Sequence, residues 1–192
     1  EVRRIKYGLT KNIATYNPLR IAYHEYAAVV HDVRAATGLR RKLGLATERD
    51  GDAALMQDLL ARMAANRADF TLTFRGLCNA AAGPEGDATV RALFTDPSAY
   101  DDWAARWRTR LADEPATPAT RTAAMRAVNP AIIPRNYLVE AALDAALQRE
   151  DLEPFEKLLA ALEHPFEDAP PNSPYATRPV PADTAYQTFC GT

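Results

Sequence analysis

The fold is decided most clearly by residues 96–111, which read DPSAYDDWAARWRTRL. Within this stretch Tyr100, Trp103 and Trp107 recur at helical spacing, and the charged residues lie off that stripe. The Asp-Pro pair at its start is favoured at the cap and first position of a helix. We therefore expect an amphipathic helix whose aromatic side chains pack into a core. Stacking of a nucleotide base on the stripe is the less favoured alternative.

Apolar residues at helical spacing continue along the chain. Alanine supplies 38 of the 192 residues, whereas valine and isoleucine together supply 13, which favours helices over strands. Further helices are predicted over 17–36, from Asp50 or Asp52 to Asn66, over 69–81, over 117–128, after Pro134 to about Arg149, and over 151–163. We expect an all-α fold, an irregular domain of about six to eight helices with an extended C-terminal strap.

Glycine and proline mark the expected ends of these elements. Gly38 is predicted to stop the first helix, and residues 83–86 are predicted to form a loop. In the last helix, the residues predicted to face inward are Phe155, Leu158, Leu159 and Leu162. Six of the 17 residues from 165 to 181 are proline, which excludes a helix and predicts an extended, polyproline-like strap.

The chain is expected to consist of three parts. Residues 1–37 form a basic helical arm or connection, residues 38–164 a helical domain, and residues 165–192 a proline-rich tail that ends in Cys190. Residues 1–42 carry nine Lys and Arg against three Asp and Glu, although the whole chain has a formal net charge of −2. The chain begins at Glu1 rather than Met, so we expect it to be a piece of a longer protein.

The composition excludes several classes of protein. With 47% hydrophobic and 25% charged residues, the chain can bury a core, which excludes disorder throughout. A pI near 6.0 argues against a generic nucleic-acid coat or a polybasic membrane binder. No apolar run approaches the roughly 20 residues that span a bilayer. Two cysteines cannot form a disulfide framework, so we expect a reducing, cytoplasmic location, and the alanine and arginine content suggests a bacterial source.

The sequence predicts no catalytic, cofactor-binding or metal-binding residue. Gly-Lys-Ser/Thr, Gly-x-Ser-x-Gly and His-Glu-x-x-His motifs are absent. His24 and His31 are seven residues apart, too far for the pair that a helix offers one metal ion. We interpret them as surface or interface histidines.

Two polar groups are candidates for contact with another domain. The cluster Arg40, Arg41 and Lys42 could clamp phosphates, but a solvated turn or a contact to an acidic surface is favoured. Arg135 and Asn136 follow two prolines four residues apart and are predicted to be the first exposed side chains of a helix. A simple capping device is the favoured interpretation of that segment.

The two cysteines are expected to differ. Cys190 lies close to the carboxyl end, where an exposed thiol can reach a partner, and an ordinary tail residue is equally compatible with its position. Cys78 lies within a predicted helix and is expected to be inert packing.

Several short blocks occur together in one order. They are residues 40–45, 68–71 with 73–75, 100–103, 128–131, 135–137, and 165–166 followed by the proline-rich tail to Cys190. As a set they resemble the C-terminal portion of the selenoprotein O family, the YdiU-type protein adenylyltransferases with a kinase-like fold. The resemblance covers about residues 38–192, and the segment 129–136 is its most specific part.

The resemblance implies an activity and partners for the parent protein. Such proteins transfer AMP from ATP to Ser, Thr or Tyr hydroxyls of protein substrates, with magnesium. The groups that hold ATP and magnesium belong to the N-terminal kinase-like domain, so this chain is expected to bind neither and to be inactive alone. The resemblance therefore implies that this chain supports the kinase-like domain, with possible contacts at Arg40, Arg41, Lys42, Arg135 and Asn136. Neither a membrane nor nucleic acid is an expected partner.

The resemblance also implies a redox role for the tail. Family members end in a tail with cysteine or selenocysteine, thought to pair with a cysteine near the active site, and Cys190 occupies that place. Here the chain ends Cys-Gly-Thr, so a vicinal dithiol is absent and a disulfide partner must lie elsewhere. Cys78 is disfavoured as that partner by its expected burial.

Two other function classes stay open. A stand-alone helical module could dock an acidic protein through the basic arm, and an RNA-binding helical domain could use residues 1–42. A steep loss of binding with salt would identify the RNA binder. The adenylyltransferase interpretation instead predicts an upstream glycine-rich loop, a lysine and paired metal-binding groups.

Overall fold

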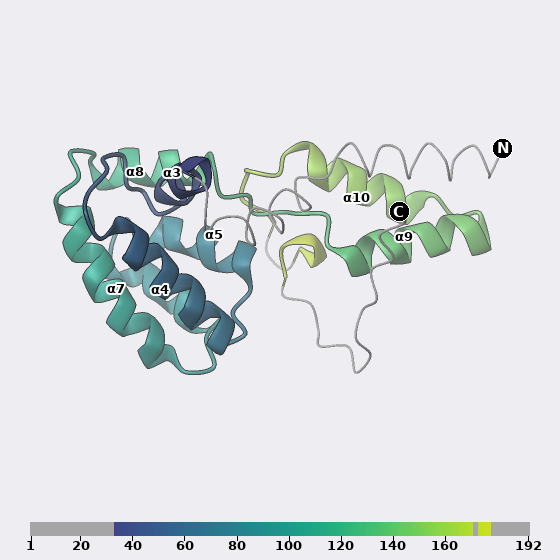
Figure 1. The fold of residues 1–192 in the computed structure, drawn as a ribbon. Coiled ribbons are helices and arrows are strands. Elements are labelled where there is room, and N and C mark those ends of the chain that lie inside the picture. The colour runs from purple at the N-terminus through teal and green to yellow at the C-terminus, as the bar shows by residue number, and fades with distance from the viewer. Residues whose placement is uncertain (1–32, 171–172, 178–192) are drawn as a thin grey trace.

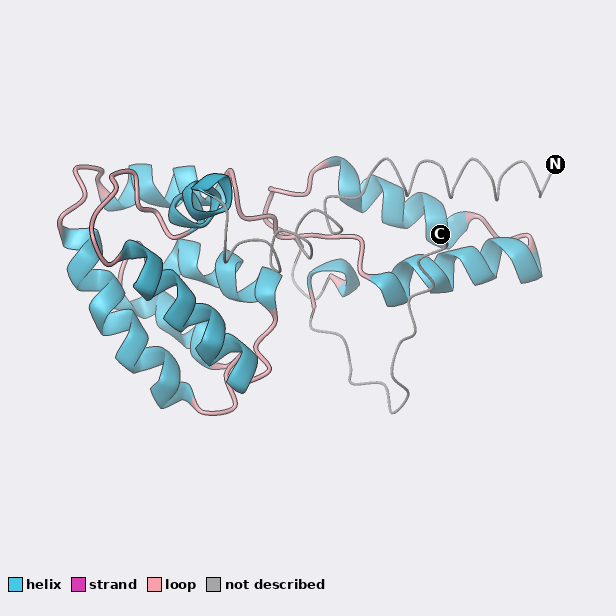
Figure 2. Cartoon of the chain, in the orientation of Figure 1, coloured by secondary structure: helices cyan, strands magenta, loops and turns pink. Residues whose placement is uncertain are grey.

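The computed structural model describes residues 33–170 and 173–177 (Figure 1). Within these residues it contains eight α-helices, two 3-10 turns and no strand, which confirms the all-α prediction (Figure 2). No helix in this part of the chain is long and apolar enough to cross a bilayer. Most of the predicted arm, both paired histidines and Cys190 lie outside the described residues.

The helices form two groups, which we call the bundle and the hairpin (Figure 1). The bundle consists of α3 (Val33–Lys42), α4 (Asp52–Ala65), α5 (Phe70–Ala80), α6 (Asp87–Arg91), α7 (Pro97–Ala112) and α8 (Pro118–Arg126), with the 3-10 turn η1 (Pro84–Gly86) before α6. The hairpin consists of α9 (Asn136–Arg149) and α10 (Glu153–Glu163), followed by the 3-10 turn η2 (Pro174–Ala176).

Side-chain caps explain where three helices of the bundle begin. The carboxylate of Asp69 accepts a hydrogen bond from the Leu72 amide at 2.9 Å, ahead of α5. Asp96 and Thr117 cap α7 and α8 in the same way, each followed by a proline at the first helical position. Each cap satisfies an amide that has no partner inside its own helix. These starts were predicted from sequence and are confirmed.

The first described helix ends later than predicted. Gly38 lies within α3 and does not stop it, because one glycine weakens a helix by only about 1 kcal/mol. The chain turns instead at Gly44, whose φ of +75° favours glycine. A Cβ on Gly44 would come within 2.8 Å of side-chain atoms of Arg121 and Met125, so the close approach of α8 also requires glycine. Gly51, with φ of +94°, precedes α4, so neither Asp50 nor Asp52 is its N-cap.

Two expected irregular segments contain short helical turns. The predicted loop at residues 83–86 includes η1 and leads directly into α6, a five-residue helix too short to give a periodic signal. In the predicted strap, residues 174–176 form the turn η2, whose first residue is a proline, as the start of a helical turn permits. Residues 171–172 and 178–181 of the strap lie outside the described residues.

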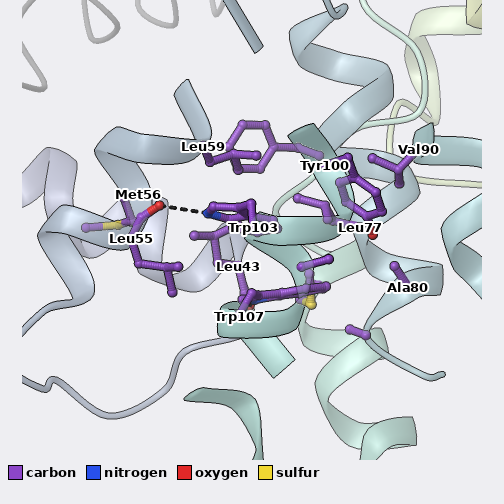
Figure 3. Close-up of a cluster of buried hydrophobic side chains, with 14 of the residues drawn as sticks. Leu43, Leu55, Met56, Leu59, Leu77, Ala80, Val90, Tyr100, Trp103 and Trp107 are labelled. Carbon is purple, nitrogen blue, oxygen red and sulfur yellow. Dashed lines mark hydrogen bonds between the residues drawn. The ribbon is translucent and has the colours of Figure 1, made fainter. Parts of the chain in front are cut away.

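Three aromatic side chains of α7 form the centre of the bundle (Figure 3). Tyr100, Trp103 and Trp107 are each 0% exposed. The indole Nε1 of Trp103 donates to the Leu55 carbonyl at 2.9 Å, and that of Trp107 donates to the Leu43 carbonyl at 3.0 Å. Both indoles thus bury their apolar surface and satisfy their one donor. The predicted core position is confirmed, and no ring face is left for a nucleotide base.

A buried ionic cluster holds the loop between α3 and α4 against α7. Arg110 donates to Asp52 and to Glu114, each at 2.7 Å, and Glu114 also accepts from the amide and hydroxyl of Thr47. Burial disfavours both charged carboxylates, but the hydrogen bonds from Thr47 and Arg110 outweigh it. The pKa values of Asp52 and Glu114 therefore lie below their ordinary values.

The hairpin has a thinner interior than the bundle. Its buried residues are Ala142, Ala145 and Ala146 on α9 and Leu158 on α10. The prediction that Leu159 faces inward is wrong, because its side chain is 51% exposed. Phe155 and Leu162 are half-buried. Among the described helices only α9 packs extensively on α10. The side of α10 that faces α9 is therefore covered by a helix, whereas the other side is not.

Candidate functional site

Charged and amide side chains from separate stretches of sequence meet where the bundle joins the hairpin. We call this group the junction cluster, and it consists of Lys42, Asp69, Arg75, Asn129, Arg135 and Asp168. Lys42 ends α3, Asp69 and Arg75 belong to the start and middle of α5, and the others lie in the segments that connect bundle and hairpin. Every block of the family resemblance except residues 100–103 lies at or next to this cluster.

Asn129 is the most buried member of the junction cluster, at 0% exposure. Its Nδ2 donates to the Lys42 carbonyl at 2.9 Å, and its Oδ1 accepts from the Lys42 ammonium at 3.4 Å. The same ammonium donates to the Val128 carbonyl at 2.8 Å. A buried amide that uses both its donor and its acceptor in this way fixes the end of α3 on the segment after α8.

An ion pair fixes the start of the hairpin. Arg135 Nη1 lies 2.7 Å from Asp69 Oδ2, and the two side chains are 8% and 12% exposed. The other oxygen of Asp69 is the cap of α5 described above. One carboxylate therefore orients α5 and holds the N-terminus of α9, and removing the arginine would leave a buried charge unpaired.

Arg75 connects α5 to both segments that link the bundle and the hairpin. Its guanidinium donates to the Asn129 carbonyl at 2.9 Å and to Asp168 at 2.6 Å, and Arg126 also contacts Asp168 at 3.1 Å. The hydrogen bond from Arg75 holds the pKa of Asp168 below its ordinary value. The amide of Ala131 donates to the Pro165 carbonyl at 2.7 Å, so the two linking segments also pair directly.

Cys78 lies beneath this cluster. It is 0% exposed, donates to the Phe74 carbonyl at 3.4 Å and lies 3.5 Å from the amide nitrogen of Asn129. Burial raises the pKa of its thiol, although Asn129 and nearby arginines favour the thiolate. The expected burial of Cys78 is confirmed. A disulfide from Cys78 would require the bundle to open.

The structure places the five predicted contact residues differently. Arg41 and Asn136 are exposed. Arg40 forms an ion pair with Glu48 at 2.9 Å, and Lys42 belongs to the junction cluster. The prediction of an exposed guanidinium at Arg135 is wrong, because the side chain turns inward to Asp69.

Sequence reasoning missed three members of the junction cluster. The sequence predicts Asp69 only as the start of a helix, and it predicts no contact for Arg75 or Asp168. Asp168 is 93 residues from Arg75, and nothing local in a sequence indicates such a pair. The one available signal was that Asp69 and Arg75 fall within the blocks of the resemblance.

The junction cluster does not fit a nucleotide with its metal ion. A triphosphate and magnesium require clustered carboxylates and cations that point toward the ligand. Here Lys42, Arg75 and Arg135 are directed at carbonyls and carboxylates of the chain itself. Within the described ranges no group of three or more His, Cys, Asp or Glu could hold a metal ion. The cluster can fix two groups of helices, and we derive no chemical step from it.

A shallow apolar cleft lies in the hairpin. It has a volume of about 200 Å³ and is lined mainly by apolar side chains of α9 and α10, with Tyr175 of η2. Its two charged lining residues, Glu153 and Lys157, pair with one another at 2.8 Å. Without further polar groups directed into it, the cleft offers little to fix the orientation of a small ligand.

Comparison with known proteins gives a consistent result. The sequence model of the family described as Protein adenylyltransferase SelO matches residues 5–163. A relative from a Bradyrhizobium species is 57% identical over 156 residues, which cover 81% of this chain and 31% of the relative. Relatives from Rhodopseudomonas palustris and Methylorubrum populi are each 46% identical over 98% of this chain, which matches 42% and 43% of their lengths. All three carry the name Protein nucleotidyltransferase YdiU, and the chain spans less than half of each.

Proposed function

The chain belongs to the protein adenylyltransferase SelO family, and from this membership we propose that it is the supporting helical region of such an enzyme. The whole protein would transfer AMP from ATP to Ser, Thr or Tyr hydroxyls of protein substrates, with magnesium. The groups that hold ATP and magnesium would lie in the kinase-like part of the protein and outside this chain.

One observation carries this proposal: the residues of the family blocks are used to join the bundle to the hairpin. Lys42, Asn129 and Arg135 contact other parts of the chain rather than a shared open site. In an enzyme whose chemistry lay in this region, polar motif residues would converge on a space that a substrate can enter. Their use as internal connections instead favours a role in holding two helical units in a fixed relation.

The contact with the kinase-like part is proposed to involve side chains at the edge of this junction. Arg41 at the end of α3 and Asn136 at the start of α9 are exposed and lie next to members of the junction cluster. A domain bound there would contact both units, so its binding would depend on the relative position of bundle and hairpin. The tail thiol of Cys190 stays a proposed redox partner for that domain, and it lies outside the described residues.

Reconstitution from two pieces tests the proposal. The two-thirds of the Bradyrhizobium relative that this chain does not match would be produced separately, and AMP transfer from labelled ATP to protein would be measured with and without this chain. We expect transfer to rise at least tenfold when the chain is added. We expect Arg135→Ala to reduce that rise and Thr109→Ala, an exposed change on α7 far from the junction, to leave it intact. Full activity of the larger piece alone would refute a supporting role.

A further inference from the structure

Two arginine side chains of the bundle bind the same carboxylate. Arg75 on α5 donates from Nη2 to Asp168 Oδ1 at 2.6 Å, and Arg126 on α8 donates from Nη1 to Asp168 Oδ2 at 3.1 Å. Each oxygen of the carboxylate is thus held by a different guanidinium. We call Arg75 and Arg126 the arginine fork. Guanidinium groups placed in this way suit oxyanions such as carboxylate and phosphate.

The bundle itself holds the arginine fork in place. Arg75 Nη1 donates to the Asn129 carbonyl at 2.9 Å, and Arg126 Nη2 donates to Asn79 Oδ1 at 2.8 Å. Each guanidinium therefore has a second contact that does not involve Asp168. We expect both groups to keep their positions when the carboxylate leaves, which lowers the entropic cost of binding another anion.

The carboxylate is the more exposed side of this contact. The side chain of Asp168 is 64% exposed, whereas that of Arg75 is 13% exposed. Asp168 lies outside any helix, in the segment that follows the hairpin. Ion pairs with an exposed partner contribute little stability, because water and salt screen them. An anion from solution can therefore compete with Asp168 for the arginine fork.

The charges of the fork and the carboxylate do not balance. Arg75 and Arg126 carry two positive charges, and among the residues that the structure describes Asp168 is the one carboxylate in an ion pair with either of them. One positive charge is therefore left over. A phosphorylated side chain carries a charge of about −1.5 to −2 at pH 7 and offers three acceptor oxygens. A phosphate group thus matches the fork more closely than a carboxylate does.

We propose that Arg75 and Arg126 form a binding site for a phosphate dianion, and that Asp168 is its internal competitor. The fork accommodates one anion at a time, so bound phosphate releases the segment that follows the hairpin from the bundle. Attachment of that segment weakens phosphate binding in turn, because such coupling is reciprocal. The site uses no metal ion, and the inference stands or falls separately from the proposed function.

Phosphate titration of the full 192-residue chain tests the site. Binding of inorganic phosphate would be followed by phosphorus NMR at constant ionic strength, with chloride as the anion that is replaced. We expect Asp168→Asn to bind phosphate about tenfold more tightly than the unaltered chain, because the competitor is removed and the fork stays. The matched control is Asp101→Asn, which removes the partner of a single exposed arginine, Arg91. It should leave the affinity for phosphate unchanged.

Two further variants test the fork itself. In the Asp168→Asn chain, Arg126→Gln should weaken phosphate binding about tenfold, because one guanidinium is lost. Asn79→Ala should weaken it several-fold, because it removes the contact that orients Arg126. Asn79 is exposed, so its replacement leaves the fold intact. Equal affinities of Asp168→Asn and the unaltered chain would overturn the proposal, and so would an affinity that both fork variants leave unchanged.

Amide hydrogen exchange tests the release of the segment. In the unaltered chain, exchange of residues 164–168 should become several-fold faster at saturating phosphate and stay unchanged in chloride at the same ionic strength. Unchanged exchange in phosphate would overturn the competition with Asp168. A phosphoserine peptide identifies the source of the ligand. Tighter binding of this peptide than of inorganic phosphate would assign the site to phosphorylated proteins, and equal binding would assign it to free phosphate.

Discussion

In the bundle, α7 buries two tryptophans and a tyrosine at 0% exposure, whereas in the hairpin α9 buries three alanines. Large aromatic side chains bury 150–250 Å² each, and alanine buries much less. The bundle can therefore be stable through its own core. The hairpin instead depends on its connections to the bundle, above all on Arg135 and Asp69.

The contrast between the two units indicates what the polar residues of the junction cluster do physically. A unit with a deep core needs no motif to hold its parts together, but a thin hairpin needs directed contacts to keep one position. The junction cluster supplies them through buried hydrogen bonds and an ion pair at 2.7 Å. The position of the hairpin on the bundle therefore depends on the contacts of the junction cluster.

The largest effect should come from the core of the bundle. Trp103→Ala removes a side chain that is 0% exposed together with its hydrogen bond to the Leu55 carbonyl. We expect the free energy of unfolding to fall by about 3–5 kcal/mol, measured by denaturant titration. Thr109→Ala, an exposed change on the same helix, should cost less than about 0.5 kcal/mol. A small effect of Trp103→Ala would mean that the bundle has no dominant core.

The second-largest effect is expected from the contact between hairpin and bundle, whose loss should destabilise the hairpin and leave the bundle unchanged. Arg135→Ala leaves the Asp69 carboxylate buried without its partner, and we expect a local loss of about 3 kcal/mol. Amide hydrogen exchange should become faster in α9 and α10 and stay unchanged in α7. Asn136→Ala, its exposed neighbour, should leave both regions unchanged. Uniformly faster exchange across the whole chain would contradict the division into two units.

A smaller, local effect is expected inside the hairpin. Leu158→Ala removes the one large buried side chain described between α9 and α10, at a cost of about 2–3 kcal/mol. Exchange should become faster in these two helices, with the unfolding midpoint of the bundle unchanged. Ala160→Ser on the exposed side of α10 is the control. If Leu158→Ala lowered that midpoint, hairpin and bundle would unfold as one unit.

Acid should affect the bundle through Asp52 and Glu114. Both pKa values are lowered in the folded chain, so the unfolded chain takes up protons more readily as the pH falls. The stability they contribute is present above their ordinary pKa values and is lost as the pH falls through the folded ones. Unfolding of the bundle should therefore become easier as the pH falls below the ordinary pKa values of 3.8 for Asp52 and 4.5 for Glu114, and Asp52→Asn should flatten that dependence. Equal pH dependence in the variant would contradict this role.

Periodicity predicted the all-α fold and most helix boundaries, because caps and apolar spacing are local properties of the sequence. Periodicity did not predict the features that depend on contacts between residues far apart in the sequence. Glycine is required at the turn after α3 because α8 approaches Gly44 closely, and Arg135 turns inward because Asp69 lies across the junction. Leu159 is exposed because one neighbouring helix covers only one side of α10. These outcomes depend on residues tens of positions away, which local patterns do not contain.

Our central proposal is that this chain supports adenylyl transfer within a longer protein and does not perform it alone. The most direct measurement incubates the 192-residue chain alone with labelled ATP and magnesium, and follows both nucleotide binding and label on protein. The account predicts no magnesium-dependent binding at millimolar ATP and no transfer of AMP to the chain or to an added protein. Labelled AMP on protein, formed in the presence of this chain alone, would contradict it.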